Sequence, residues 1–148
     1  MTLRWILASL HLLALGIGLG AVCVRAMALR RPDANGLRRA FAADTAWGLA
    51  AGLWIATGAA RAFGGLEKGS DYYLGSTAFQ VKMALLLAIL VLEVAPMVTL
   101  VRWRIQLKRG AEIDLRRAPL LARISLVQAV LVVCMVFAAT AMARGMGA

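Results

Sequence analysis

Four long apolar runs separated by short connections fill the chain of 148 residues and restrict what it can fold into. A helix that crosses the hydrocarbon core of a bilayer takes about 20 largely apolar residues. Such helices and their connections use nearly the whole chain. We therefore expect one all-α transmembrane domain over residues 1–148, a bundle of four transmembrane helices in two helical hairpins. The expected spans are about Trp5–Val24, Phe41–Ala60, Ala78–Val101 and Pro119–Met142.

The composition agrees with a lipid environment. Hydrophobic residues make up 62% of the chain and charged residues 16%, whereas soluble proteins carry about 25% charged residues. A net charge of +10 would suggest nucleic acid as a partner if the charge formed one patch. The basic residues instead flank the apolar runs, so we expect the lipid bilayer as partner and no nucleic acid.

Twelve of the 17 basic residues lie in the first and third connections or at the adjacent ends of the spans. They are Arg25, Arg30, Arg31, Arg38, Arg39, Arg102, Arg104, Lys108, Arg109, Arg116, Arg117 and Arg123. Because short loops rich in Lys and Arg stay in the cytoplasm, both connections are expected there. The second connection, with Arg61 and Lys68, and both termini are then expected on the outer side.

A signal peptide, a disulfide and a metal site are alternatives that we consider and do not favour. Arg4 followed by an apolar run resembles a signal peptide, but Trp5–Val24 is longer than the usual apolar region of about 7–15 residues. Cys23 and Cys134 are expected at different depths, as packing residues without a disulfide. Together with the single histidine, His11, they do not provide a zinc or iron–sulfur site within one chain.

Two connections carry turn and interface signals. Arg31–Gly36 combines proline with Asn-Gly, which accepts positive φ, and is expected to close the first hairpin. Residues 63–75 mix glycine, charge and the pair Tyr72 and Tyr73, which favours the membrane interface. This outer connection is expected to cover the outer mouth of the bundle.

Glycines four residues apart occur in the first two spans, as Gly16 with Gly20 and Gly48 with Gly52. This spacing lets membrane helices approach closely, so tight packing of spans one and two is the first interpretation. Clearance for a flat cofactor is the alternative.

Ionisable residues inside the spans are costly unless they are paired, buried in the bundle or functional. They fall into two layers. The outer layer holds His11, Arg61 and Lys82, and the layer toward the cytoplasm holds Arg25, Asp44, Glu93 and Arg102. Helical periodicity places His11 with Arg25 on one face of span one, and Lys82 with Glu93 on one face of span three. If these faces meet, both layers lie along one interior seam.

For the inner layer we favour structural ion pairs, in which Asp44 and Glu93 pair with Arg25 and Arg102 and tie helices together. Pro96, one turn after Glu93, is expected to kink span three. For the outer layer two interpretations stay open. Lys82 can snorkel and His11 can hydrogen-bond to a neighbouring helix, or the neutral imidazole can bind a metal-bearing or porphyrin cofactor.

The segments Leu10–Gly16, Trp47–Gly58, Arg61–Tyr73 and Phe79–Met83 together resemble an uncharacterised family of bacterial four-helix inner-membrane proteins, catalogued as a domain of unknown function. The resemblance covers most of the chain. It implies a bacterial inner (plasma) membrane location, with both termini periplasmic, and no particular activity.

The early histidine of span one and the lysine at the start of span three are also distantly similar to the layout of HemJ-type protoporphyrinogen oxidases and CopD-like membrane proteins. That similarity implies haem b, with His11 as the metal ligand and Lys82 as a second ligand or propionate partner. Arg61 is the other candidate propionate partner. The chain lacks further histidines, so a haem would be five-coordinate, ligated by His with Lys or Met, or shared between protomers.

Three functions from different classes follow. The first is a haem- or porphyrin-binding redox protein, and the second is an accessory or assembly subunit of a larger membrane complex or homo-oligomer. A small transporter ranks last, because only Gln128 extends the polar seam across the midplane. The chain contains no nucleotide, phosphate or nucleophile motif that would place it in a soluble enzyme class. Whether the protein is an enzyme therefore stays open.

Overall fold

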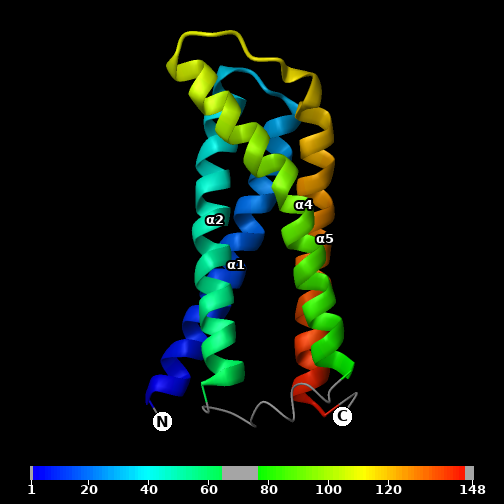
Figure 1. Cartoon of the computed structure of the whole chain (residues 1–148). Helices are drawn as coiled ribbons and strands as arrows, with labels where there is room; N and C mark the ends of the chain where they lie inside the picture. Colours follow the sequence, from blue (N-terminus) through cyan, green and yellow to red (C-terminus); the bar gives the residue numbers. More distant parts are fainter. Residues whose placement is uncertain (1, 65–76, 146–148) are drawn as a thin grey trace.

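The computed structural model describes residues 2–64 and 77–145. Within these residues the protein is helical and contains no strand, so the all-α expectation is confirmed. The long helices are α1 (Thr2–Arg30), α2 (Ala34–Phe63), α4 (Thr77–Lys108) and α5 (Ala118–Ala143), and a short 3₁₀ helix η1 (Leu115–Arg117) precedes α5 (Figure 1). Each expected span lies inside one long helix, and every helix extends beyond it.

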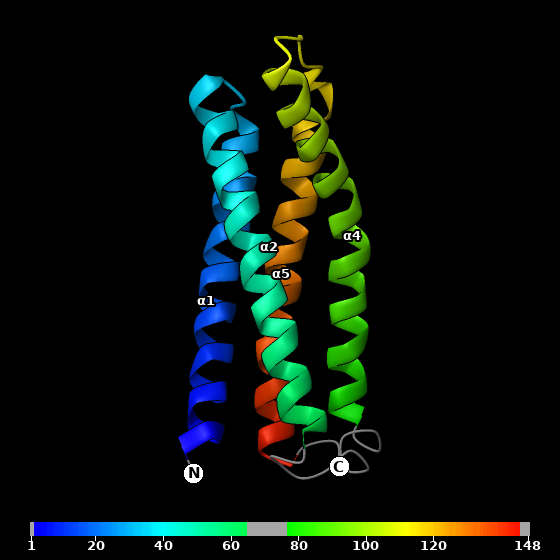
Figure 2. The ribbon, with the colours of Figure 1, turned by 60° about the vertical axis from the view of Figure 1, so that its left-hand side comes forward.

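The helices form two antiparallel hairpins that lie side by side (Figures 1 and 2). The connections α1–α2 and α4–α5 are at one end of the molecule, and both termini are at the other. Helix α1 packs against α2 and α5, and α4 packs against α5, whereas α2 and α4 contact each other only slightly. Around the bundle the order is therefore α2, α1, α5, α4.

Three helical segments are long and apolar enough to cross a membrane: Thr2–Arg30, Thr77–Lys108 and Leu115–Ala143. Most of their large apolar side chains point outward, among them Leu13 and Ile17 on α1, Val91 on α4 and Phe137 on α5. Such outward apolar surfaces fit lipid. Helix α2 is equally long but is not among these segments. Its sequence is rich in Gly and Ala, so the number of four spans stays a prediction.

The first connection is shorter than the expected turn. Asp33 caps α2 by accepting a hydrogen bond from the Gly36 backbone N–H at 2.6 Å, and the helix already begins at Ala34. The expectation that Asn35 and Gly36 form the turn is therefore wrong. Gly36 is needed for a different reason, because a Cβ there would lie 2.0 Å from the Arg31 carbonyl oxygen. Only glycine fits this close approach between α1 and α2.

The interpretation of the glycine pairs is also wrong in detail. Gly16, Gly20, Gly48 and Gly52 have no side chain near the position of a Cβ and lie on outward faces. The close contact of α1 with α2 is at Gly18, whose added Cβ would lie 3.4 Å from the Trp47 ring. Residues on a helix are rotated by about 100° per position, so Gly18 faces away from its neighbours two positions on either side.

Two further expectations concern α4 and the outer connection. Helix α4 runs without interruption through Pro96 and changes direction along its length (Figure 1). Proline has no N–H to donate to the carbonyl of Leu92, which is the reason to expect a kink at this residue, and the kink itself stays a prediction. The outer connection expected over residues 63–75, with Tyr72 and Tyr73, lies almost wholly outside the described residues.

Candidate functional site

A cavity of about 640 Å³ lies at the end of the bundle that carries the termini. Its walls come from the start of α1, the end of α2, the start of α4 and the end of α5, and most of the lining side chains are apolar. His11, Arg61 and Lys82 all line it. The three residues that the sequence places in an outer layer thus share one cavity, whose size falls in the range of about 300–1,000 Å³ typical of ligand pockets.

His11 is held by α2 on one side of its ring. Its Nδ1 lies 2.9 Å from the Oγ1 of Thr57, and the ring stacks on Trp54 with centroids 5.6 Å apart. Gly58 leaves room for the imidazole, since a Cβ at that position would lie 3.2 Å from Cε1 of His11. Residues 54, 57 and 58 lie on one face of α2 and fix the position of the histidine ring.

Two basic side chains line the cavity. Arg61 and Lys82 are half-buried, and none of the described lining residues is acidic. Trp54 also lines the cavity, and among the described residues its buried indole Nε1 has no hydrogen-bond acceptor. An apolar chamber with two cations and a buried N–H donor suits an amphipathic ligand that carries anionic or carbonyl oxygens.

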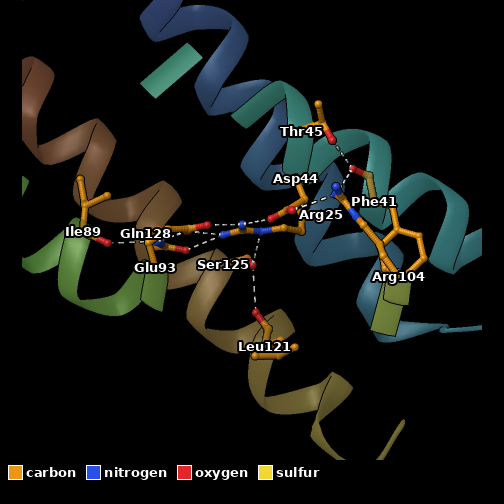
Figure 3. A network of polar contacts seen from close by, with 10 residues as sticks. All are labelled: Arg25, Phe41, Asp44, Thr45, Ile89, Glu93, Arg104, Leu121, Ser125 and Gln128. Carbon is orange, nitrogen blue, oxygen red and sulfur yellow. Dashed lines mark hydrogen bonds and ion pairs between the residues drawn. The ribbon is translucent and has the colours of Figure 1, made fainter. Parts of the chain in front are cut away.

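A second polar site lies nearer the other end of the bundle and centres on Arg25, which is 0% exposed (Figure 3). Its Nη1 donates to Asp44 at 2.9 Å and to Glu93 at 2.8 Å. Its Nη2 donates to Glu93 and to Gln128, each at 2.8 Å. Its Nε donates to Ser125 at 3.0 Å. All five N–H groups of the guanidinium therefore have an acceptor.

The partners of Arg25 are themselves fixed by further hydrogen bonds. Ser125 donates its hydroxyl proton to the Leu121 carbonyl at 2.9 Å, so its oxygen is an acceptor for Arg25. Gln128 donates to Glu93 at 2.8 Å and to the Ile89 carbonyl at 3.2 Å. This network, formed by Arg25, Asp44, Glu93, Arg104, Ser125 and Gln128 and called the Arg25 network below, joins all four long helices.

The structure differs from the sequence hypothesis in the second arginine. Arg104 donates to Asp44 at 2.9 Å and to the Phe41 carbonyl at 2.7 Å, whereas Arg102 is exposed. Side chains two residues apart on a helix point in directions about 200° apart, so only one of the two arginines can face α2. The carboxylates of Asp44 and Glu93 then balance the charges of Arg25 and Arg104.

Sequence reasoning also missed Ser125, and it considered Gln128 only as the one residue that could extend a polar seam in the transporter hypothesis, which it ranked last. The available signal was their spacing, since two polar residues three apart on an apolar helix share one face. The predicted face of α1 is inward: His11, Gly18, Val22 and Arg25 are buried along it, and Leu15 is partly buried. On the predicted face of α4, Ile89 is buried, and Lys82, Leu86 and Glu93 are partly buried. Among the described residues, no three His, Cys, Asp or Glu side chains gather into a metal-binding group.

Comparison with known proteins identifies a family and little more. Residues 3–147 match the family described as "Predicted membrane protein (DUF2214)". Comparisons with curated proteins and with solved structures give no match. The expected membership of a family of predicted membrane proteins is therefore confirmed, and the distant similarity to HemJ-type and CopD-like proteins has no support from these comparisons.

Proposed function

The chain belongs to the DUF2214 family of predicted membrane proteins, and on that premise we propose that it is a four-span inner-membrane protein that binds haem b or a related porphyrin in the cavity beside His11. The observation that carries the proposal is the convergence of His11, Arg61 and Lys82 on one mainly apolar cavity of about 640 Å³. These residues come from three different helices.

The residues of the cavity fit such a ligand. The tetrapyrrole ring requires an apolar slot, which the side chains around Leu15, Leu86 and Met135 offer. Its two propionates require cations, and Arg61 and Lys82 supply them. A b-type haem also requires an imidazole, which His11 supplies at the cavity wall. Bound there, haem supplies one-electron redox chemistry, while the protein holds the ring, excludes water and neutralises the propionates.

The two cations lead to a prediction about ligand charge. Replacing Arg61 and Lys82 together by glutamine is expected to weaken binding of haemin by about tenfold or more, because both charge-assisted hydrogen bonds to the propionates are lost. Binding of haemin dimethyl ester, which lacks the two carboxylates, should hardly change. Titration of the detergent-purified apoprotein by absorbance measures both affinities.

The control for this pair is Arg102→Gln with Lys108→Gln, which removes two exposed cations at the other end of α4. Equal weakening of haemin and of its dimethyl ester by the Arg61 and Lys82 substitutions would contradict the propionate role.

The proposed topology follows from the placement of the basic residues. Both hairpin connections, at one end of the molecule, carry clusters of arginine, which favours that end in the cytoplasm. We expect a periplasmic reporter such as alkaline phosphatase to be active when fused after residue 148. A fluorescent protein that folds only in the cytoplasm should fluoresce when inserted after Ala111.

A third reporter, fused to the N-terminus and compared with the one after residue 148, tests the span count. With four spans the N- and C-termini lie on one side of the membrane, and reporters at both ends agree. If α2 does not cross, the termini lie on opposite sides, and reporters that disagree would contradict the four-span proposal.

A second candidate function is favoured by the outward glycines. Gly48 and Gly52 lie on the exposed face of α2, the long helix that is not among the apolar candidate spans. A face of small residues suits contact with another membrane helix better than contact with lipid. This supports an accessory subunit or a homo-oligomer. Replacement of both glycines by leucine should then abolish co-purification of a partner or a second copy, whereas Ala111→Leu, at an exposed position in the connection, should not.

A further inference from the structure

The hydrogen bond between His11 and Thr57 determines which nitrogen of the histidine carries the proton. The two atoms, Nδ1 and Oγ1, are 2.9 Å apart, and Thr57 is only 4% exposed. Either the hydroxyl donates to the ring or the ring donates to the hydroxyl. The surroundings of Thr57 decide between these two arrangements.

The Thr57 hydroxyl has one proton, and that proton is directed to the backbone of its own helix. Oγ1 lies 2.7 Å from the Leu53 carbonyl oxygen and 3.1 Å from that of Trp54. A carbonyl oxygen accepts and never donates, so the hydroxyl proton must point toward these oxygens. If it pointed to His11 instead, two oxygen lone pairs would face each other at 2.7 Å in a buried place. Oγ1 therefore acts as the acceptor for the ring.

We infer that Thr57 is a positioning residue that holds His11 as the Nδ1–H tautomer, so that the lone pair of the ring is on Nε2. Metal-binding histidines commonly donate the proton of their other nitrogen to an oxygen, which fixes the tautomer and the ring orientation. Gly58 and Trp54 restrict the ring from two further sides. The arrangement thus prepares the imidazole for ligation through Nε2.

The consequence for haem rests on the proposed function, but the tautomer itself does not. The chain has a single histidine, so protein labelled with ¹⁵N-histidine and purified without a histidine tag has only two ring nitrogens to observe. We expect the spectrum of the apoprotein to show one protonated and one unprotonated nitrogen. The two-bond couplings to the ring carbon protons should identify the protonated one as Nδ1.

Substitutions at Thr57 separate positioning from general structure. Thr57→Val keeps the shape and removes the acceptor, so the proton should move to Nε2 in much of the population. Thr57→Ser should restore the Nδ1–H form. Thr45→Val is the matched control, because Thr45 also bonds to a carbonyl of its own helix, that of Phe41, but lies on the exposed face. It should leave the histidine spectrum unchanged.

Haemin binding gives a second readout. Thr57→Val should weaken it by about 10–100-fold, the usual cost of losing the outer partner of a metal-binding histidine, and Thr57→Ser should restore it. A proton on Nε2, or on both nitrogens, in the wild-type apoprotein would overturn the inference. A wild-type protein with the Nδ1–H tautomer that does not bind haemin would leave this inference standing and refute the haem proposal.

Discussion

Replacement of Arg25 by methionine is expected to destabilise the protein by about 3–5 kcal/mol, the usual cost of removing one partner of a buried ion pair. The substitution leaves Asp44 and Glu93 without their main cation in the interior of the bundle. It also leaves the side-chain oxygens of Ser125 and Gln128 without the guanidinium N–H groups that donate to them. Unfolding of the purified protein by titration with sodium dodecyl sulfate, followed by circular dichroism, measures the loss.

Two variants make this prediction specific. Arg102→Met removes an exposed arginine from α4 and should change the free energy of unfolding by less than about 0.5 kcal/mol. Combining Arg25→Met with Asp44→Asn and Glu93→Gln removes the uncompensated charges and should recover much of the lost stability. An Arg25→Met protein as stable as the wild type would show that the Arg25 network does not hold the four helices together.

Replacement of His11 by alanine is expected to weaken haemin binding more than about 100-fold, because loss of the ligand itself should exceed the 10–100-fold cost of losing an outer partner. The fold should persist, since none of the hydrogen bonds of the Arg25 network involves His11. Titration of the apoprotein with haemin in detergent, followed by absorbance, gives the affinities. Circular dichroism of the variant checks that the helices remain.

Added imidazole should restore binding to His11→Ala, because the missing ring leaves a space of matching shape. Leu13→Ala, on the outward face of the same helix, is the control and should bind haemin like the wild type. Unchanged haemin affinity in His11→Ala would show that any bound haem is held without this histidine.

The elements of the fold could be predicted from the sequence because a membrane helix is specified by length and apolar content alone. The inward face of α1 was also predictable, since His11, Val22 and Arg25 follow helical periodicity and are among the residues that the structure buries. The residue at which the first connection ends could not be predicted from the sequence. Asn35-Gly36 has strong turn chemistry, but Asp33 caps the helix one turn earlier and the backbone of Arg31 approaches Gly36 too closely for any other residue.

The polar sites were predictable in kind and only partly in detail. Ionisable residues in apolar helices had to lie in the interior, and Arg25, Asp44 and Glu93 do form ion pairs. The choice of Arg104 over Arg102 depends on how α4 is rotated against α2, which the sequence of α4 does not encode by itself. Thr57 follows Ala50 and Trp54 on the periodic buried face of α2 but carries no charge. Its contact with His11 could therefore be found only from the packing of α1 on α2.

The Arg25 network and the cavity lie toward opposite ends of the bundle. The Arg25 network joins α1, α2, α4 and α5 near the level of the hairpin connections. At the opposite end, where α2 and α4 hardly meet, the helices leave the cavity that contains His11. A closed polar layer at one end and a cavity at the other thus coexist in one bundle, and ligand sites in helix bundles are built from side chains on facing helices in this way.

The most direct test of haem binding is the absorption spectrum of the wild-type protein, expressed with haem available and purified in detergent, before and after reduction with dithionite. We expect a Soret band that shifts on reduction and that is absent from His11→Ala prepared in the same way. A wild-type protein that is colourless under these conditions, and that stays colourless when haemin is added, would contradict the haem proposal.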